Sequence, residues 1–214
     1  IFLKGCPLRC VWCANPESQA PYPEIIYYPR RCVGCGRCLD VCPNGAIRAE
    51  GEYRLRTDAA LCSICGRCVD VCVYGARELI GETKSVGDLM RIVRRDRRHY
   101  DHSGGGVSIS GGEPLLQCQF VLELLKACKA EGIHTAVETC GFAPWDCFES
   151  ILPYLDLLFF DIKHLDAERH RALTGRSNVQ ILENLSRVAR VFAGGEIIVR
   201  IPYVPGCNDE VRIL

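Results

Sequence analysis

From residue 85 onward, the chain alternates between short apolar runs and longer stretches in which apolar residues recur at helical spacing. Short apolar runs bounded by glycine and polar residues predict strands, and a 3.6-residue period between them predicts amphipathic helices. We expect strands over 107–110, 135–137, 157–160 and 197–201, and helices over 85–100, 114–131, 145–152, 166–174 and 179–192. Strands that alternate with helices are typical of βα units around a parallel sheet. Residues 1–3 predict a fifth strand.

Polar motifs follow four of the predicted strands. The cysteine-rich loop 6–13 follows residues 1–3, and segments 111–113, 138–141 and 161–163 follow the next three strands. In (β/α) barrels the active site is built at the carboxyl ends of the strands. We therefore expect these four segments to converge on one mouth.

Residues 29–81 interrupt this pattern with an internal repeat. The spacing C-x2-C-x2-C-x3-C begins at Cys32 and again at Cys62, thirty residues later. This spacing is that of two-cluster bacterial ferredoxins, in which the fourth cysteine of each run binds the other cluster. We expect one 4Fe–4S cluster on Cys32, Cys35, Cys38 and Cys72, and a second on Cys62, Cys65, Cys68 and Cys42. The clusters either staple a small module or relay electrons, and we favour both roles together.

The N-terminal loop contains Cys6, Cys10 and Cys13 at C-x3-C-x2-C spacing. Three thiolates on one tight loop can hold three corners of a cubane iron–sulfur cluster and leave the fourth iron open. A structural zinc site is an alternative, but it requires four closed ligands, and no nearby Cys or His completes this set. Redox-active thiols are a second alternative. The spacing favours the open iron–sulfur site.

The composition narrows the class of protein. The chain has 214 residues, zero formal net charge and 16 cysteines, of which eleven fall into the three metal-type sets. Zero net charge argues against a nucleic-acid binder, and no apolar run is long enough to span a membrane. Iron-bound thiolates fit a reducing cytosol. The remaining cysteines are expected to be mostly small buried hydrophobic residues: Cys118, Cys128, Cys140, Cys147 and Cys207.

The loop C-x3-C-x2-C resembles the signature of the radical S-adenosylmethionine (SAM) enzymes. The flanking segments 2–5 and 12–15 look like those of the glycyl radical enzyme activases, and the resemblance extends over essentially the whole chain. It implies an α/β fold with a partial (β/α) barrel over 1–28 and 82–214, truncated at both ends. A ferredoxin-like module with two clusters is inserted at 29–81.

The resemblance also implies a SAM site. Gly111, Gly112 and Glu113 match the element that binds the SAM amino group, and the Glu113 carboxylate can accept from an ammonium. The element Asp161-Ile162-Lys163 is similar to one that contacts the methionine end of SAM, and Arg200 resembles an arginine near the ligand. Trp12, Ala14 and Asn15 are expected on the adenine and ribose side, and Glu138 near a monovalent cation. No catalytic residue is assigned.

The implied activity is that of an activase with three 4Fe–4S clusters. An electron from flavodoxin or ferredoxin cleaves SAM to methionine and a 5′-deoxyadenosyl radical, which takes a hydrogen atom from a backbone glycine of a partner glycyl radical enzyme. An open iron is oxygen-sensitive, so we expect the cytoplasm of an anaerobe. Another radical SAM enzyme acting on a small molecule or peptide is an alternative. An iron–sulfur electron carrier is another, although a carrier needs neither the three-cysteine loop nor Gly-Gly-Glu-Pro.

Overall fold

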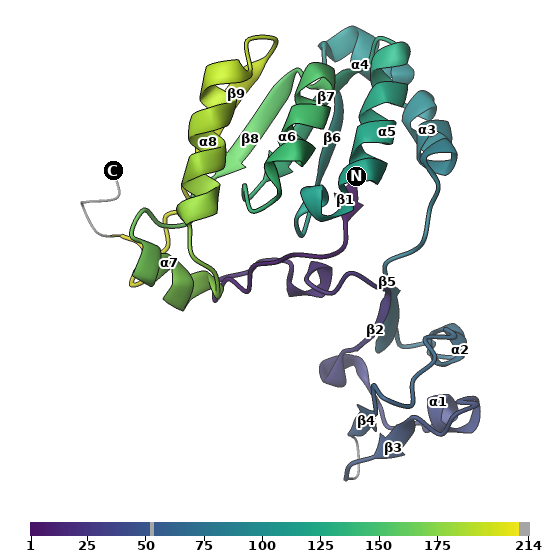
Figure 1. Ribbon diagram of the computed structural model, residues 1–214. Helices are drawn as coiled ribbons and strands as arrows, with labels where there is room; N and C mark the ends of the chain where they lie inside the picture. Colours follow the sequence, from purple (N-terminus) through teal and green to yellow (C-terminus); the bar gives the residue numbers. More distant parts are fainter. Residues whose placement is uncertain (52–53, 210–214) are drawn as a thin grey trace. The chain divides into compact units, whose positions relative to one another are not determined.

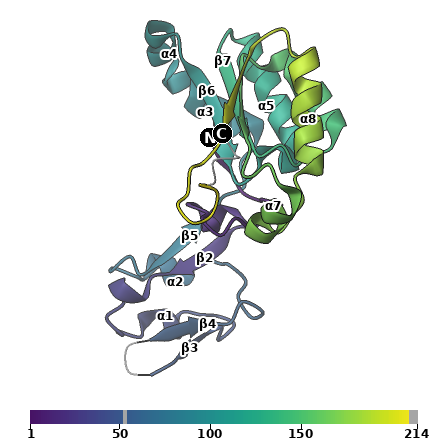
Figure 2. The same cartoon turned by 90° about the vertical axis from the view of Figure 1, so that its left-hand side faces the viewer.

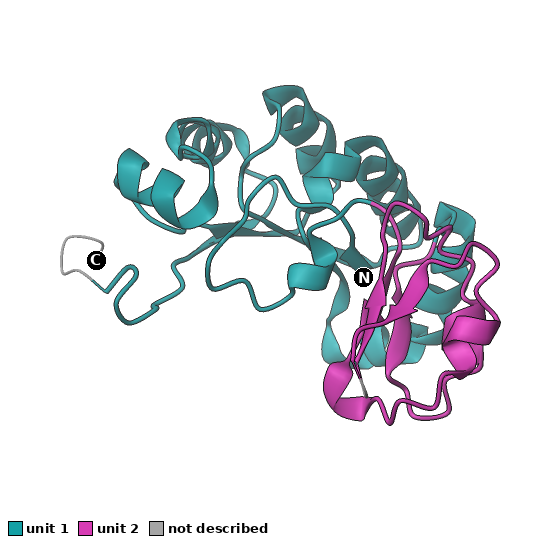
Figure 3. Ribbon diagram, turned by 90° about the horizontal axis from the view of Figure 1, so that it is seen from below, with its two compact units in different colours: residues 1–21, 83–214 teal, residues 22–82 magenta. Residues whose placement is uncertain are grey.

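The computed structural model describes residues 1–51 and 54–209. The chain forms two compact units. Unit 1 comprises residues 1–21 and the chain from residue 83 onward, and unit 2 comprises residues 22–82 (Figure 3). Unit 2 thus begins before residue 29, the start expected from the sequence. The physical reason is strand pairing, since β2 (Glu24–Tyr27) is hydrogen-bonded antiparallel to β5 (Arg77–Ile80).

Unit 1 contains a parallel sheet of five strands, which confirms the predicted α/β class. Its order is β1 (Phe2–Leu3), β6 (Gly106–Gly111), β7 (His134–Thr139), β8 (Leu157–Asp161) and β9 (Glu196–Arg200). Every neighbouring pair is parallel. The strands follow one another across the sheet in chain order, as βα units of a partial barrel do. All five carboxyl ends therefore lie at the same edge.

The helices of unit 1 are α3 (Val86–Arg95), α4 (Arg97–Ser103), α5 (Cys118–Ala130), α6 (Trp145–Ile151), α7 (Ala167–Thr174) and α8 (Val179–Val191). The views in Figure 1 and Figure 2 place α5 and α8 on the same face of the sheet. Fully buried apolar side chains from strands and helices form one core, among them Ile109, Leu124, Val137, Phe148 and Phe160. Within the described ranges, no helix combines the length and apolar character that crossing a membrane requires.

Two local features differ from the sequence expectations. The predicted helix 85–100 is divided at Asp96, which ends α3 and begins α4. Cys118 and Cys147 are among the five cysteines expected to be mostly small buried hydrophobic residues, but they form a disulfide between the first residue of α5 and helix α6. Sequence spacing alone could not pair them, because their proximity depends on the packing of α5 against α6.

Unit 2 is small and internally repeated. The antiparallel pair β2–β5 has its counterpart in β3 (Ile47–Ala49) and β4 (Leu55–Thr57), and α1 (Arg37–Asp40) has its counterpart in α2 (Arg67–Asp70). Each short helix follows a glycine with positive φ, Gly36 at 75° and Gly66 at 78°. The buried apolar cluster of this unit contains Cys38, Ile47, Leu55 and Cys68.

Candidate cofactor site

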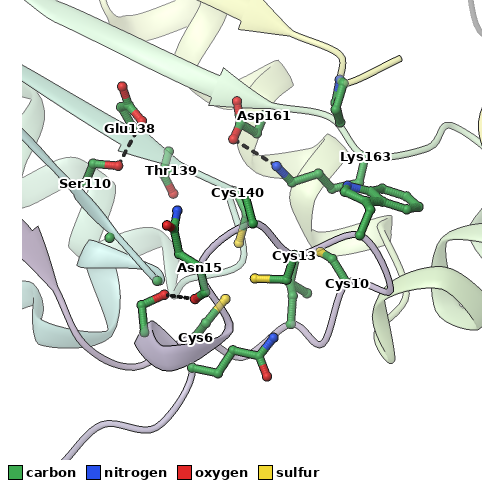
Figure 4. A pocket seen from close by; sticks show the side chains of 18 residues that line it. Cys6, Cys10, Cys13, Asn15, Ser110, Glu138, Thr139, Cys140, Asp161 and Lys163 are labelled. Atoms are coloured by element: carbon green, nitrogen blue, oxygen red, sulfur yellow. Dashed lines mark hydrogen bonds and ion pairs between the residues drawn. The ribbon is translucent and has the colours of Figure 1, made fainter. Parts of the chain in front are cut away.

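A cavity of about 270 Å³ opens in unit 1 at the carboxyl ends of the strands (Figure 4). All three cysteines of the N-terminal loop line it. The cavity wall also contains eight of the eleven residues predicted to bind the cofactor: Trp12, Ala14, Asn15, Gly111, Gly112, Glu138, Asp161 and Lys163. Segments far apart in the sequence therefore meet here, as expected for motifs that follow parallel strands.

The cysteine loop is anchored on both sides by backbone hydrogen bonds. Arg9 N donates to Thr174 O at 2.7 Å and Val11 N to Leu173 O at 3.0 Å, which ties the loop to the end of α7. Gly5 N donates to Ser18 O at 2.7 Å, and the Leu8 side chain is only 1 % exposed. The loop that carries the three thiols is thus fixed by the fold around it.

The three thiols form a donor set suited to iron. Burial raises the pKa of the Cys6 thiol to about 11 and raises that of Cys10, although Lys163 acts on Cys10 in the opposite direction. Such thiols become ligands when a bound metal supplies the positive charge that stabilises the thiolate. Across 1–51 and 54–209, no three His, Cys, Asp or Glu side chains lie close enough together to hold a single metal ion. The three thiols line one cavity, and three cysteine thiolates are the donor set that holds three irons of a cubane cluster.

Cys140 is a fourth thiol in the cavity wall, and it points into the same space in Figure 4. The sequence interpretation treated it as a small buried hydrophobic residue, and it is indeed only 6 % exposed. Its thiol pKa is raised well above the ordinary value by burial and by the neighbouring Glu113. The signal that could have assigned it to the site is its place directly after β7, in the segment 138–141.

A charged network crosses the carboxyl ends of β6, β7, β8 and β9. Glu138 accepts from Ser110 Oγ at 2.8 Å, and Asp161 accepts from Lys163 Nζ at 2.9 Å. Arg200 donates to both acids, to Asp161 Oδ1 at 2.7 Å and to Glu138 Oε2 at 3.2 Å. The parallel register, which places Arg200 opposite Asp161, explains this pairing. Arg200 therefore holds two cavity carboxylates but is not itself part of the cavity wall.

Glu113 departs most from its expected role. The side chain is fully buried and outside the cavity wall. Its carboxylate accepts from Leu115 N at 3.0 Å, from Thr139 Oγ1 at 2.8 Å and from Cys140 N at 2.7 Å. Burial raises its pKa, although these donors act against the rise. In this structure the carboxylate positions Thr139 and Cys140 from behind the wall. Ile162 is likewise in the apolar core and outside the wall.

The two glycines before Glu113 are required by close packing of the chain. A Cβ on Gly111, where φ is 126°, would collide with the backbone of Leu3, and one on Gly112 would collide with Gly5 O. Gly112 N donates to Leu3 O at 2.9 Å and Glu113 N to Gly5 O at 2.7 Å. Glycine thus lets the end of β6 lie against the start of the cysteine loop and presents backbone, without side chains, to the cavity.

In the described part of unit 2, two of the cavities are each lined by four cysteines. One cavity is lined by Cys32, Cys35, Cys38 and Cys72, and the other by Cys42, Cys62, Cys65 and Cys68. These are the sets predicted from the repeat, including the exchange of the fourth cysteine. Ala46 N donates to Cys42 Sγ at 3.2 Å and Ala76 N to Cys72 Sγ at 3.3 Å. Burial acts to raise the pKa of Cys42, but backbone N–H groups outweigh it and lower that pKa. Such donors are typical of sulfur atoms in iron–sulfur centres.

Comparison with known proteins gives consistent matches. The family model of the radical SAM superfamily matches residues 1–213. The chain is 45% identical over 214 residues to the isethionate sulfite-lyase activating enzyme of Oleidesulfovibrio alaskensis, covering 98% of this chain and 69% of the relative. It is 47% identical over 212 residues to the (2S)-3-sulfopropanediol sulfolyase activating enzyme of Bilophila wadsworthia, covering 98% and 70%. The choline trimethylamine-lyase activating enzyme of O. alaskensis is 42% identical over 212 residues, covering 98% and 68%.

Proposed function

Because the chain belongs to the radical SAM superfamily, and within it to the activating enzymes of glycyl radical enzymes, we propose that the cavity of unit 1 is its SAM site. Membership implies a 4Fe–4S cluster, SAM and a glycyl radical enzyme as partner. The observation that carries the proposal is the convergence of three thiols, two carboxylates and a lysine on one cavity.

Cys6, Cys10 and Cys13 hold the open cluster in this proposal. When bound, the cluster would give one electron to SAM, whose bond from sulfur to the 5′ carbon breaks to leave methionine and a 5′-deoxyadenosyl radical, and this radical would take a hydrogen atom from a backbone glycine of the partner. The protein contributes binding and orientation. Trp12, Ala14 and Asn15 lie on the cysteine loop and provide the wall for adenine and ribose.

The polar wall binds the methionine end of SAM. Lys163 offers a cation to the SAM carboxylate, and Asp161 offers a carboxylate to the ammonium. Since the Glu113 carboxylate lies outside the cavity wall, whereas Gly111 and Gly112 line it, the backbone of these glycines is the part of this motif that reaches the ligand. Glu138 is the candidate for a monovalent-cation site. Arg200 keeps both acids in place.

The cysteine sets of unit 2 hold two auxiliary 4Fe–4S clusters, which makes three clusters in total. N–H groups directed at Cys42 and Cys72 support this part of the proposal. The clusters connect an external donor, flavodoxin or ferredoxin, with the open cluster. An oxygen-sensitive centre of this kind belongs in the cytoplasm of an anaerobe.

The test uses anaerobically reconstituted and reduced protein, SAM, and a panel of glycyl radical enzymes of the kinds that the relatives activate. We expect a glycyl radical signal by electron paramagnetic resonance (EPR) in at least one partner, and none with Cys10→Ala. A Lys163→Ala variant retains the cluster and should raise the SAM concentration needed for half-maximal signal at least tenfold. SAM cleavage coupled to turnover of a small metabolite, with no radical on any partner, would favour the alternative radical SAM enzyme. A reduced-cluster EPR signal that SAM leaves unshifted would favour the electron carrier.

A further inference from the structure

The two cysteine-lined cavities of unit 2 are related by the repeat, but their walls differ in charge. The thirty-residue offset pairs Arg77 with Ile47 and Tyr27 with Thr57. Arg77 and Tyr27 line the cavity of Cys32, Cys35, Cys38 and Cys72. Ile47 and Thr57 line the cavity of Cys42, Cys62, Cys65 and Cys68. Each wall also contains one arginine of the repeat, Arg37 in the first and Arg67 in the second, so the walls differ in charge by Arg77 against Ile47.

Arg77 is buried to a degree that is unusual for arginine, at 2 % exposure. Its Nη1 donates to Thr57 Oγ1 at 2.8 Å, and its guanidinium carbon lies 5.0 Å from the centre of the Tyr27 ring. Within the described part of the chain, Nε and Nη2 are buried without a hydrogen-bond partner. A buried cation with unpaired donors is unfavourable unless a negative group compensates it.

An iron–sulfur cluster on four thiolates is such a negative group. It carries net negative charge, and its sulfur atoms accept N–H donors. We propose that Arg77 faces the cluster held by Cys32, Cys35, Cys38 and Cys72, stabilises its reduced state, and so makes it the first of the two auxiliary clusters to accept an electron. This inference rests on the proposed presence of those clusters.

The redox step is a one-electron transfer. The external reductant loses one electron, the cluster gains it, and no bond forms or breaks. The added negative charge is attracted by the guanidinium, so the reduction potential of this cluster lies above that of a cluster without this additional cation. The cluster beside Ile47 lacks this cation.

The charge of Arg77 also reaches the second cavity. Arg77 Nη1 donates to Thr57 Oγ1, and Thr57 lines that cavity. Removal of the charge should therefore lower the reduction potential of both clusters. The decrease should be much larger for the cluster whose cavity Arg77 lines. The difference between the two shifts is the property that the experiment measures.

The experiment is a redox titration of the full chain, followed by EPR, in which Cys6, Cys10 and Cys13 are replaced by alanine so that only the auxiliary clusters contribute. We expect two reduction steps that differ at least tenfold in equilibrium constant, about 59 mV for a one-electron couple. Arg77→Met should lower the equilibrium constant of the upper reduction step at least tenfold, and that of the lower reduction step by less. Arg77→Lys, which keeps the charge, should give a smaller shift. Ile47→Arg is the matched control and should raise the equilibrium constant of the lower reduction step.

Several outcomes would overturn the inference. In the parent protein, a single unresolved step would show that the clusters are equivalent. Equal shifts of both reduction steps in Arg77→Met would show that the cation does not distinguish the two clusters. If Arg77→Met does not take up its clusters, the titration of Ile47→Arg tests the same point. Iron and sulfide analysis distinguishes failure of the inference about Arg77 from failure of the proposed function. A parent protein with far fewer than about eight iron atoms per chain lacks the auxiliary clusters, which overturns both.

Discussion

The two units place cysteines around cavities in different structural settings. In unit 1, three thiols lie on a loop beside a large apolar core built from Leu, Val, Ile and Phe side chains of the sheet and its helices. Among the described residues of unit 2, the buried apolar cluster has four members, and two of them, Cys38 and Cys68, are themselves predicted ligands. We therefore expect unit 1 to bury enough apolar surface to fold around an empty site, and unit 2 to depend on what its cysteines bind.

The largest expected effect is the response to iron removal. Anaerobic treatment with a chelator and a mild oxidant should unfold unit 2 and leave unit 1 folded, because ligands replace a core only in unit 2. Hydrogen exchange followed by mass spectrometry measures both units in one sample. Amides of β2, β3, β4 and β5 should lose their protection completely, and those of α5 and β7 should keep it.

The matched control removes only the open cluster, by replacing Cys6, Cys10 and Cys13 with alanine. Both units should then retain their protection. If the strands of unit 2 stay protected after all iron has gone, the unit has a sufficient core of its own and the contrast between the units fails.

A pair of glycine substitutions gives the next largest effect. Gly111→Ala should destabilise unit 1 by about 4 kcal/mol or more, because the new Cβ collides with the backbone of Leu3 and neither strand can move aside cheaply. Gly66→Ala also has a positive φ of 78°, but no atom lies within 4 Å of its Cβ position. Only the left-handed conformation then disfavours alanine, by about 1–2 kcal/mol.

Denaturant unfolding measures the two glycine variants separately. Both tryptophans, Trp12 and Trp145, belong to unit 1, so their fluorescence follows that unit. With Cys6, Cys10 and Cys13 replaced by alanine, so that the open cluster is absent, visible absorbance of the auxiliary clusters follows unit 2. Similar decreases in the free energy of unfolding of the two variants would show that the close approach of the β1 and β6 backbones is not what requires glycine at residue 111.

The same contrast explains what the sequence could predict. The repeat in unit 2 predicts two sets of four cysteines, and each set lines one cavity, because cysteine spacing is a local property of the sequence. In unit 1, periodicity gives the five strands and hence the residues at their carboxyl ends. The direction of the Glu113 side chain and the pairing of Cys118 with Cys147 depend on tertiary contacts, and no spacing rule contains that information. Cys140 was in the correct segment, but its type suggested only packing.

The smallest expected effect comes from one type of hydrogen bond in two environments. Asn184 on α8 is 3 % exposed and donates from Nδ2 to Gly141 O and Ala143 O, both at 2.9 Å, which fixes the segment after Cys140. Asn44 in unit 2 donates to Leu61 O, also at 2.9 Å, in an exposed position. Loss of a donor in a buried site leaves carbonyls that water cannot reach.

Asn184→Ala should therefore lower the stability of unit 1 by about 1–3 kcal/mol. Asn44→Ala should change the stability of unit 2 by no more than about 0.5 kcal/mol, because water replaces the exposed amide. Tryptophan fluorescence and cluster absorbance follow the two unfolding transitions as before. Asn184→Asp, which keeps the size but loses the amide donor, should resemble the alanine variant. A loss for Asn44→Ala as large as that for Asn184→Ala would mean that unit 2 relies on its local hydrogen bonds as heavily as unit 1 does, and that its clusters alone do not hold it together.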